Sequence, residues 1–155
     1  MSGAVCIERA EVRHVDELAP LFAAYRLFYG RPDDPRARPF LEQRLGRGES
    51  VIFIARQQGA AIGFTQLYPS FASVSLGRMF LLYDLFVAPQ ARHCGAGAAL
   101  LEAAVDYARA EDAVELMLQT ATSNIAAQRL YERRGWVRDD EFYVYNFRLP
   151  GPSSA

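Results

Sequence analysis

The sequence predicts a single α/β domain, and three features of the chain lead to that prediction. An apolar stretch at 78–87 is followed by a helical pattern at 98–110 and a second apolar stretch at 115–120. A strand, helix and strand in this order produce a parallel strand pair. Two further apolar stretches, 51–55 and 61–67, flank a short glycine-containing turn that is typical of a hairpin. The length of 155 residues and the 51% hydrophobic content are sufficient for one buried core.

The remaining elements follow from hydrophobic spacing and from residues that start or stop helices. Asp16 and Glu17 favour the start of a first helix, and Gly30 with Pro32 ends it. In chain order we expect a strand at Val5–Arg9, helices at Val15–Tyr29 and around Phe40–Leu45, a polar loop at Pro69–Ser75, a helix from Ser123 or Asn124 to Gly135, and closing strands at Trp136–Val137 and Phe142–Leu149. The chain shows no internal repeat or linker, so these elements belong to one domain.

The charged residues exclude several classes of function. The 17 cationic residues face 18 acidic ones without a basic tail, so a nucleic-acid partner is not expected. Every cation is an arginine, and the lack of lysine excludes P-loop, Schiff-base and pyridoxal chemistry. The two histidines, His14 and His93, are isolated in the sequence, so no metal site is expected.

The features that bear on cellular location favour the cytoplasm. No apolar run approaches the ~20 residues that span a membrane. The N-terminal residues lack the apolar segment of a secretory signal. The chain has only Cys6 and Cys94, which argues against a disulfide framework and suits a reducing compartment.

The segment between the central strand and its helix has the features of a phosphate-binding loop. Arg92, Gly95 and Gly97 lie where the helix begins, and a helix start offers unpaired N–H groups and a partial positive charge. The glycines allow a ligand to approach the backbone closely, and Arg92 can add a charge-assisted pair. A dinucleotide-binding pattern fails because Leu100 stands at the position of its third glycine. Cys94 in this loop is either a small space-filling residue or a thiolate nucleophile.

A second pattern, N-x-x-A-x-x-L-Y-x-x-x-G-W, begins at Asn124 in the next predicted helix. Asn124, Ala127 and Tyr131 are spaced i, i+3 and i+7, so they share one face of the helix. A narrow ligand can lie along this face, with Asn124 and Tyr131 as polar contacts. An ordinary amphipathic helix with Tyr131 in the core would have the same spacing.

Together, the glycine loop and this second pattern resemble the GCN5-related N-acetyltransferases (the GNAT superfamily) in order and spacing over about residues 80–137. The loop matches the R-x-x-G-x-G/A pattern that follows a V-x-P turn in the acetyl-CoA loop of that superfamily. The resemblance implies one acetyltransferase domain at 1–149 and a disordered tail at 150–155. It also implies a mixed, mostly antiparallel sheet of about six to seven strands with a splayed central parallel pair, flanked by about four helices.

The resemblance further implies which residues form the site and what they do. Tyr131 would protonate the departing thiolate of CoA, and Asp84 would take the proton of the amine. Substrate contacts are expected from Tyr29, Tyr83 and Asp84. The expected acetyl-CoA contacts are Leu85, Phe86, Val87, Arg92, His93, Cys94, Gly95, Ala96, Gly97, Ala98, Asn124, Ala127 and Tyr131. Acetyl-CoA is the only co-substrate implied, and no metal is.

The implied activity is the transfer of an acetyl group from acetyl-CoA to a primary amine of a small cationic acceptor. Within the superfamily the chain looks most like the diamine and polyamine N-acetyltransferases, although it has Tyr83-Asp84 where several of them carry Glu-Asp. Two alternatives stay open, namely a protein or peptide lysine or N-terminal acetyltransferase and a non-catalytic acetyl-CoA sensor. The acidic turn at Asp33-Asp34 would suit any cationic acceptor.

The last predicted strand also bears on assembly. Residues Phe142–Phe147 are aromatic and nearly uncharged, and such a strand is an aggregation hazard when its edge is free. We therefore expect a homodimer whose interface includes this stretch, since two-fold dimers are the commonest soluble assembly. The alternative is that the strand pairs wholly within its own sheet.

Overall fold

The computed structural model describes residues 3–151, which form two compact units divided after Gln119. The first unit contains β1 (Val5–Arg9), η1 (Val12–His14), α1 (Val15–Phe28), α2 (Ala37–Gly46), β2 (Val51–Gln57), β3 (Ala60–Ala72), β4 (Gly77–Val87), η2 (Pro89–Ala91), α3 (Ala96–Ala110) and β5 (Glu115–Leu118). The second unit contains α4 (Ile125–Arg133). Residues 152–155 of the predicted disordered tail lie outside the described residues. Within residues 3–151, no helix is long and apolar enough to cross a membrane.

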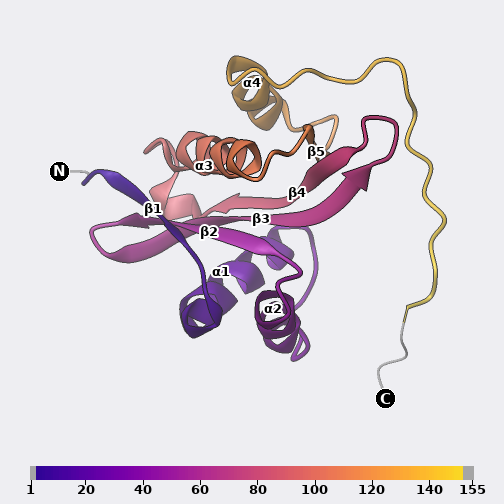
Figure 1. Cartoon of the computed structure of the whole chain (residues 1–155). Coiled ribbons are helices and arrows are strands. Elements are labelled where there is room, and N and C mark those ends of the chain that lie inside the picture. The colour runs from indigo at the N-terminus through magenta and orange to yellow at the C-terminus, as the bar shows by residue number, and fades with distance from the viewer. Residues whose placement is uncertain (1–2, 152–155) are drawn as a thin grey trace. The chain divides into compact units, whose positions relative to one another are not determined.

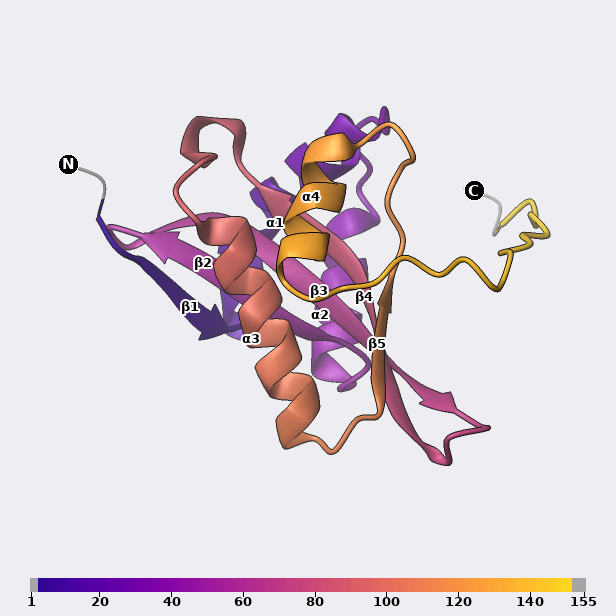
Figure 2. The same ribbon diagram turned by 90° about the horizontal axis from the view of Figure 1, so that it is seen from above.

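The first unit is built on a five-stranded sheet with the strand order β1-β2-β3-β4-β5. The pairs from β1 to β4 are antiparallel, and the β4–β5 pair is parallel. Helix α3 connects β4 to β5 and covers one face of the sheet, while α1 and α2 lie on the other face (Figures 1 and 2). The predicted α/β class and its mixed, mostly antiparallel sheet with one parallel pair are confirmed.

Strand β2 shows how the sheet is buried on both faces. Successive residues of a strand point to opposite faces. Ile52 and Ile54 join the apolar cluster that includes Leu18 of α1, whereas the Phe53 ring meets Tyr107 of α3 with 5.9 Å between ring centroids. A strand that is covered on both sides therefore reads as a continuous apolar run, which is the pattern seen at 51–55.

A β-bulge interrupts the register between β3 and β4. Gln66 of β3 is opposite Asp84, but the next residue, Leu67, is opposite Leu82. Tyr83 is therefore an extra residue on β4 without a partner position on β3. Bulges of this kind are common next to active sites, where they redirect side chains.

The bulge turns the side chains of β4 from one face of the sheet to the other. Before it, the Phe80 ring packs against Tyr107 of α3 with 5.4 Å between centroids. After it, the Phe86 ring packs against Tyr25 of α1 at 5.9 Å. Both positions are even-numbered, so an unbroken strand would have placed them on the same face. The extra residue thus directs the end of β4 toward α1.

The sheet has five strands rather than the expected six to seven, because the closing strands predicted at Trp136–Val137 and Phe142–Leu149 do not form. Tyr143 and Tyr145 in this stretch are each 90% exposed. Aromatic and β-branched residues favour a strand when they fit a half-buried surface beside a pairing partner. Within the described chain, this stretch pairs with no other strand, so its strand propensity alone does not make it a strand.

Strand β3 is longer than predicted, because the expected polar loop at Pro69–Ser75 lies partly within it. The strand continues to Ala72, and Pro69 is opposite Phe80 of β4. On its other side, β3 pairs with β2 only as far as Leu67. Beyond that point β3 is an edge, where a proline without an N–H group costs no ladder hydrogen bond.

Gly63 of β3 supports a close approach between β3 and β4 that a side chain would prevent. A Cβ atom at Gly63 would lie 2.6 Å from the carbonyl oxygen of Phe86. We expect Gly63→Ala to lower the free energy of unfolding by about 1–3 kcal/mol, the usual cost of overpacking. Gly46→Ala, at the end of α2, is the matched control, because its Cβ would lie at an ordinary contact distance of 4.0 Å from Val12. This substitution also lowers the conformational entropy of the unfolded chain, so it should not destabilise the protein. Urea unfolding measures both variants, and an unchanged stability of Gly63→Ala would contradict the close approach.

Candidate functional site

The loop between β4 and α3 presents free backbone amides at the start of a helix. Two residues of this loop, His93 and Gly95, have left-handed backbone conformations with φ values of 67° and 85°. Gly95 is the N-cap of α3, and the amide of Ala99 donates to its carbonyl at 3.0 Å. The amides before Ala99, at 95–98, have no acceptor within the helix. Left-handed residues at such a position form a concave anion site, so the loop is suited to a phosphate group.

One side chain of the loop contacts β4 and α1, and another bonds the backbone of the preceding turn. Arg92 donates from Nε to the carbonyl of Val87 at 3.1 Å, and its guanidinium carbon lies 5.6 Å from the centre of the Phe28 ring. Cys94 donates from Sγ to the carbonyl of Ala91 at 2.8 Å. The thiol is engaged with the loop backbone, which supports the space-filling interpretation of Cys94 over the nucleophile.

The end of β4 that leads into this loop has one open edge. Strand β5 pairs with β4 only from Met79 to Leu82. Beyond the bulge β4 continues to Val87, with β3 as its neighbour on the other side. Within the described part of the first unit, the backbone of 85–87 therefore has no strand partner on the β5 side. An extended ligand can pair with such an edge as an added strand does.

Asp84 is a buried carboxyl group that the bulge directs toward α1. It is 5% exposed, and Gln66 donates from Nε2 to its Oδ2 at 2.7 Å. The hydroxyl of Tyr25 interacts with the same carboxyl, while Thr65 donates from Oγ1 to the backbone carbonyl of Asp84 at 2.8 Å. Burial raises the pKa of the Asp84 carboxyl, and the hydrogen bond from Gln66 opposes that rise, with a smaller contribution from the nearby Tyr25 hydroxyl. That hydroxyl itself donates to the backbone carbonyl of Tyr83 at 3.5 Å.

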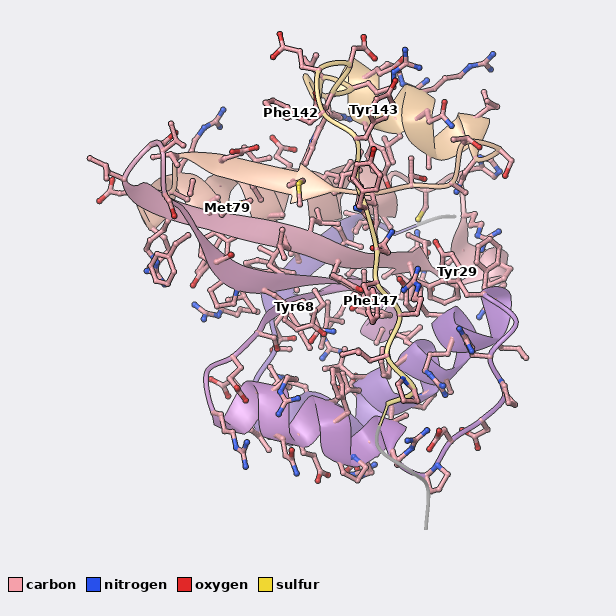
Figure 3. The ribbon with its side chains drawn as sticks, turned by 90° about the vertical axis from the view of Figure 1, so that its right-hand side faces the viewer. Tyr29, Tyr68, Met79, Phe142, Tyr143 and Phe147 are labelled. Atoms are coloured by element: carbon pink, nitrogen blue, oxygen red, sulfur yellow. The ribbon has the colours of Figure 1, made fainter. Side chains whose placement is uncertain are left out.

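Tyr25 and Tyr68 act on this carboxyl, and each packs against a further tyrosine. The rings of Tyr25 in α1 and Tyr29 at its C-cap are 5.1 Å apart between centroids, and those of Tyr68 and Tyr83 are 5.4 Å apart. Burial and the nearby Asp84 raise the pKa of the Tyr25 and Tyr68 hydroxyls. Figure 3 shows Tyr68 on the face of the sheet that the first two helices cover, and Tyr29 at the end of α1. Aromatic faces beside a carboxylate attract an ammonium group through cation–π and charge interactions.

The acidic turn does not offer a free pair of carboxylates. Arg36 forms an ion pair with Asp34 at 2.6 Å, and the guanidinium holds the pKa of that carboxyl well below its usual range. This local pairing weakens the expectation that Asp33-Asp34 attracts a cationic acceptor. Among residues 3–151, no three His, Cys, Asp or Glu side chains are placed together as metal ligands.

The second unit carries the other predicted pattern at the start of a helix. Asn124 is the N-cap of α4, and its Oδ1 accepts a hydrogen bond from the amide of Ala127 at 3.2 Å. The rings of Tyr131 and Trp136 lie 6.2 Å apart between centroids. The helix therefore places Asn124, Ala127 and Tyr131 on one face, as their spacing predicted.

The sequence analysis missed Gln66 as a site residue and did not assign Tyr25 and Tyr68 to the acceptor side. Gln66 is fully buried in a strand whose other residues are mostly apolar. A polar residue at such a position needs a buried hydrogen-bond partner, which was the available signal. The partner itself, Asp84, could not be identified because it depends on the register between β3 and β4.

The chain is similar to acetyltransferases in sequence and in structure. Residues 16–136 match the acetyltransferase (GNAT) family. The uncharacterized N-acetyltransferase YhfO from Bacillus subtilis (strain 168) is 48% identical over 145 residues, which are 93% of this chain and 97% of YhfO. The crystal structure of a probable acetyltransferase has 42% identity and a TM-score of 0.89, covering 95% of this chain and 99% of that one. A ribosomal-protein-alanine N-acetyltransferase from Brucella melitensis biovar Abortus 2308 has 27% identity and a TM-score of 0.79, covering 93% and 100%.

Proposed function

Because the chain belongs to the GNAT family of acetyl-CoA-dependent N-acetyltransferases, we propose that it acetylates a primary amine of a small cationic acceptor, such as a diamine, a polyamine or a lysine-like amino acid. One observation carries the proposal. The open edge of β4 leads directly into the amides at the start of α3 that have no acceptor within the helix, and Asp84 lies on the same strand just before that edge. A thioester donor and an amine acceptor can thus be bound side by side.

The backbone would do most of the binding of acetyl-CoA. The pyrophosphate would lie on the amides of 92–98, where the helix start favours negative charge. The pantetheine arm would pair with the open edge at 85–87, and Asn124 with Ala127 would add contacts from α4. This assignment places the thioester near the amides of Leu85 and Val87, which could stabilise the developing oxyanion.

The chemistry would be a direct attack of the neutral amine on the thioester carbon. The new N–C bond forms as the C–S bond breaks, and the sulfur leaves as the CoA thiolate. Tyr131 would donate its phenolic proton to that thiolate. Asp84 would take one proton from the acceptor ammonium before the attack, with Tyr29 and Tyr83 forming part of the acceptor site. The second proton, which the nitrogen loses as the amide forms, would pass through water and restore the phenol of Tyr131. A base with a raised pKa is suited to proton transfer near neutral pH.

The acceptor is the least constrained part of the proposal. The relatives do not confirm the resemblance to diamine and polyamine enzymes. The Brucella relative is named for acetylating a ribosomal-protein alanine, so a protein or peptide acceptor is the second candidate. A turnover screen with polyamines, lysine-like amino acids, aminoglycosides and a histone peptide separates these classes. Acetyl-CoA binding without turnover on any of them would favour the non-catalytic sensor.

We also infer a homodimer and a cytoplasmic location. The C-terminal stretch Phe142–Phe147 exposes large aromatic side chains, and soluble proteins normally cover patches of this kind. A second copy of the chain would supply the cover. Cys6 and Cys94 are both free thiols, which suits a reducing compartment.

Binding of acetyl-CoA to the helix start is tested by thermal unfolding. We expect acetyl-CoA to raise the melting temperature of the wild type, because a ligand that binds only the folded state stabilises it. Gly97→Glu should lose this shift, since it places bulk and negative charge where the phosphates would lie. Ala110→Glu, at the other end of α3, is the control and should keep the shift. A full shift in Gly97→Glu would refute the phosphate-binding assignment.

The role of Tyr131 is tested by removing its hydroxyl. Tyr131→Phe should keep the affinity for acetyl-CoA but lose roughly 10²- to 10⁴-fold in turnover, the usual contribution of one general acid. Tyr107→Phe, in the packed core of the first unit, controls for the general loss of a phenol. Steady-state kinetics and acetyl-CoA titration measure the two effects separately. Normal turnover in Tyr131→Phe would mean that water protonates the thiolate.

Assembly is tested by light scattering at micromolar concentration. The chain has a mass of 17.3 kDa, and we expect twice that mass for the wild type. Tyr145→Glu should yield a monomer, because a buried unpaired charge is costly at an interface. Arg148→Gln, just beyond the aromatic stretch, should remain a dimer. A monomer mass for the fully active wild type would rule out the proposed interface.

A further inference from the structure

Gln66 has a buried side-chain amide in which the nitrogen is hydrogen-bonded but the oxygen is not. The residue is 0% exposed and lies directly opposite Asp84 in the β3–β4 ladder. Its Nε2 donates to Oδ2 of Asp84 at 2.7 Å, whereas its Oε1 is buried without a hydrogen-bond partner. Buried polar atoms are nearly always paired, so an unpaired amide oxygen beside a carboxyl group calls for a function.

The side chains around Asp84 are neutral and come from three elements. Gln66 and Tyr68 come from β3, Tyr25 comes from α1, and Tyr83 precedes Asp84 in β4. Within the described residues, Asp84 forms no ion pair, in contrast to the exposed Asp16 and Glu17 of α1. The charge of Arg44 acts on Tyr68 of this cluster. The charge of Asp84 is therefore balanced by hydrogen bonds alone.

We propose that Gln66 is a positioning residue that serves both protonation states of Asp84 during acetyl transfer. When Asp84 is ionised, Nε2 of Gln66 donates to the carboxylate. When Asp84 carries a proton, the amide turns over, and Oε1 accepts the new O–H group. This inference rests on the proposed function, in which Asp84 takes the proton of the acceptor amine.

The proton balance explains why both states need a partner. An N–H bond of the acceptor ammonium breaks, and an O–H bond forms on Asp84, so a positive and a negative charge disappear together. Neutral species are favoured in a buried site, which assists this transfer. Asp84 then releases the proton to water after the product leaves. An amide can act as donor in one state and acceptor in the other, which an arginine or lysine side chain cannot.

The direction in which loss of Gln66 shifts the pKa of Asp84 depends on which protonation state the Gln66 amide stabilises as a donor. The Nε2 hydrogen bond stabilises the carboxylate, so it holds the pKa of Asp84 below the value that burial alone would produce. Without this bond the pKa of Asp84 rises. The carboxyl group is then ionised, and so able to accept a proton, only at higher pH. The acidic limb of the rate profile therefore moves to higher pH.

The first experiment measures the pKa of the Asp84 carboxyl group by ¹³C NMR titration of the free protein. The carboxyl signal is assigned because it is lost in Asp84→Asn. Gln66→Met keeps the length of the side chain but has no amide. We expect it to raise the pKa of Asp84 by about one to two units, the equivalent of one hydrogen bond to a charged group. Thr65→Val is the matched control, since its hydroxyl is as deeply buried but bonds the backbone carbonyl of Asp84. In Thr65→Val, the pKa of Asp84 should equal that in the wild type.

The second experiment measures kcat/KM against pH with the best acceptor from the screen. The acidic limb of Gln66→Met should move upward by the same interval as the NMR value, with the plateau at high pH less affected. An unmoved limb and an unmoved NMR pKa would overturn the role of Gln66, and so would an equal shift in Thr65→Val. If Gln66→Met does not fold, Gln66→Glu decides, because two carboxyl groups sharing one proton must raise the pKa further.

The two levels of the proposal fail in different ways. An NMR shift in Gln66→Met without any turnover by the wild type would remove the proposed function but keep the contact between Gln66 and Asp84. Normal turnover in Asp84→Asn would show that Asp84 does not take the amine proton, and this outcome overturns the inference. Turnover that depends on Asp84 but not on Gln66 would overturn the inference and keep the proposed function.

Discussion

The candidate site depends on one extra residue in β4. Tyr83 shifts the register between β3 and β4, and the side chains after it face α1 instead of α3. The pairing of β4 with β5 ends at Leu82, immediately before the same residue. A single bulge therefore accounts for both halves of the site, because it buries Asp84 beneath the first helix and leaves the following backbone open on one edge. Bulges near active sites redirect a side chain or end strand pairing, and here one bulge does both.

The sequence predicted those parts of the fold that depend on neighbouring residues. The glycines before α3 and the cap at Asn124 are local features, since a helix start needs particular residues within one turn. The positions of β1, β2 and β4 followed from apolar runs in the same way. The register shift at Tyr83 could not be predicted, because a single strand does not show which residues its neighbour places opposite. Gln66 was missed for that reason, although it lies directly opposite its partner Asp84 on the neighbouring strand.

The closing strands were predicted wrongly for a related reason. The stretch at 142–147 is mostly aromatic with one β-branched residue, which is a composition typical of a strand. Composition reports that a segment fits a pleated surface, but the surface must be supplied by another strand. Local propensity therefore identified a segment able to pair without identifying a partner. The same segment is exposed in the described chain, which is the observation behind the proposed interface between copies.

The backbone carries the predicted contacts to the donor, whereas side chains carry those to the acceptor. Amides at 95–98 and the open edge at 85–87 need only glycine or small residues to stay accessible, so the donor side leaves a short and recognisable pattern in the sequence. The acceptor side depends on rings and a carboxyl group drawn from α1, β3 and β4, and this grouping leaves no pattern in any one segment. This difference explains why the sequence indicates acetyl-CoA more sharply than it indicates the amine.

Asp84 differs from the other acidic residues of the first unit in the groups that surround its carboxyl. Other acids such as Asp34 and Glu17 form ion pairs with arginines, which keeps their pKa low and their charge fixed. Asp84 is buried with neutral donors, so its charge is stabilised less and its pKa is raised. An arginine in place of Gln66 would hold the carboxylate permanently ionised and would make it a weak base. A neutral amide leaves the carboxyl group able to gain and lose a proton, which is the property that the proposed proton transfer to Asp84 requires.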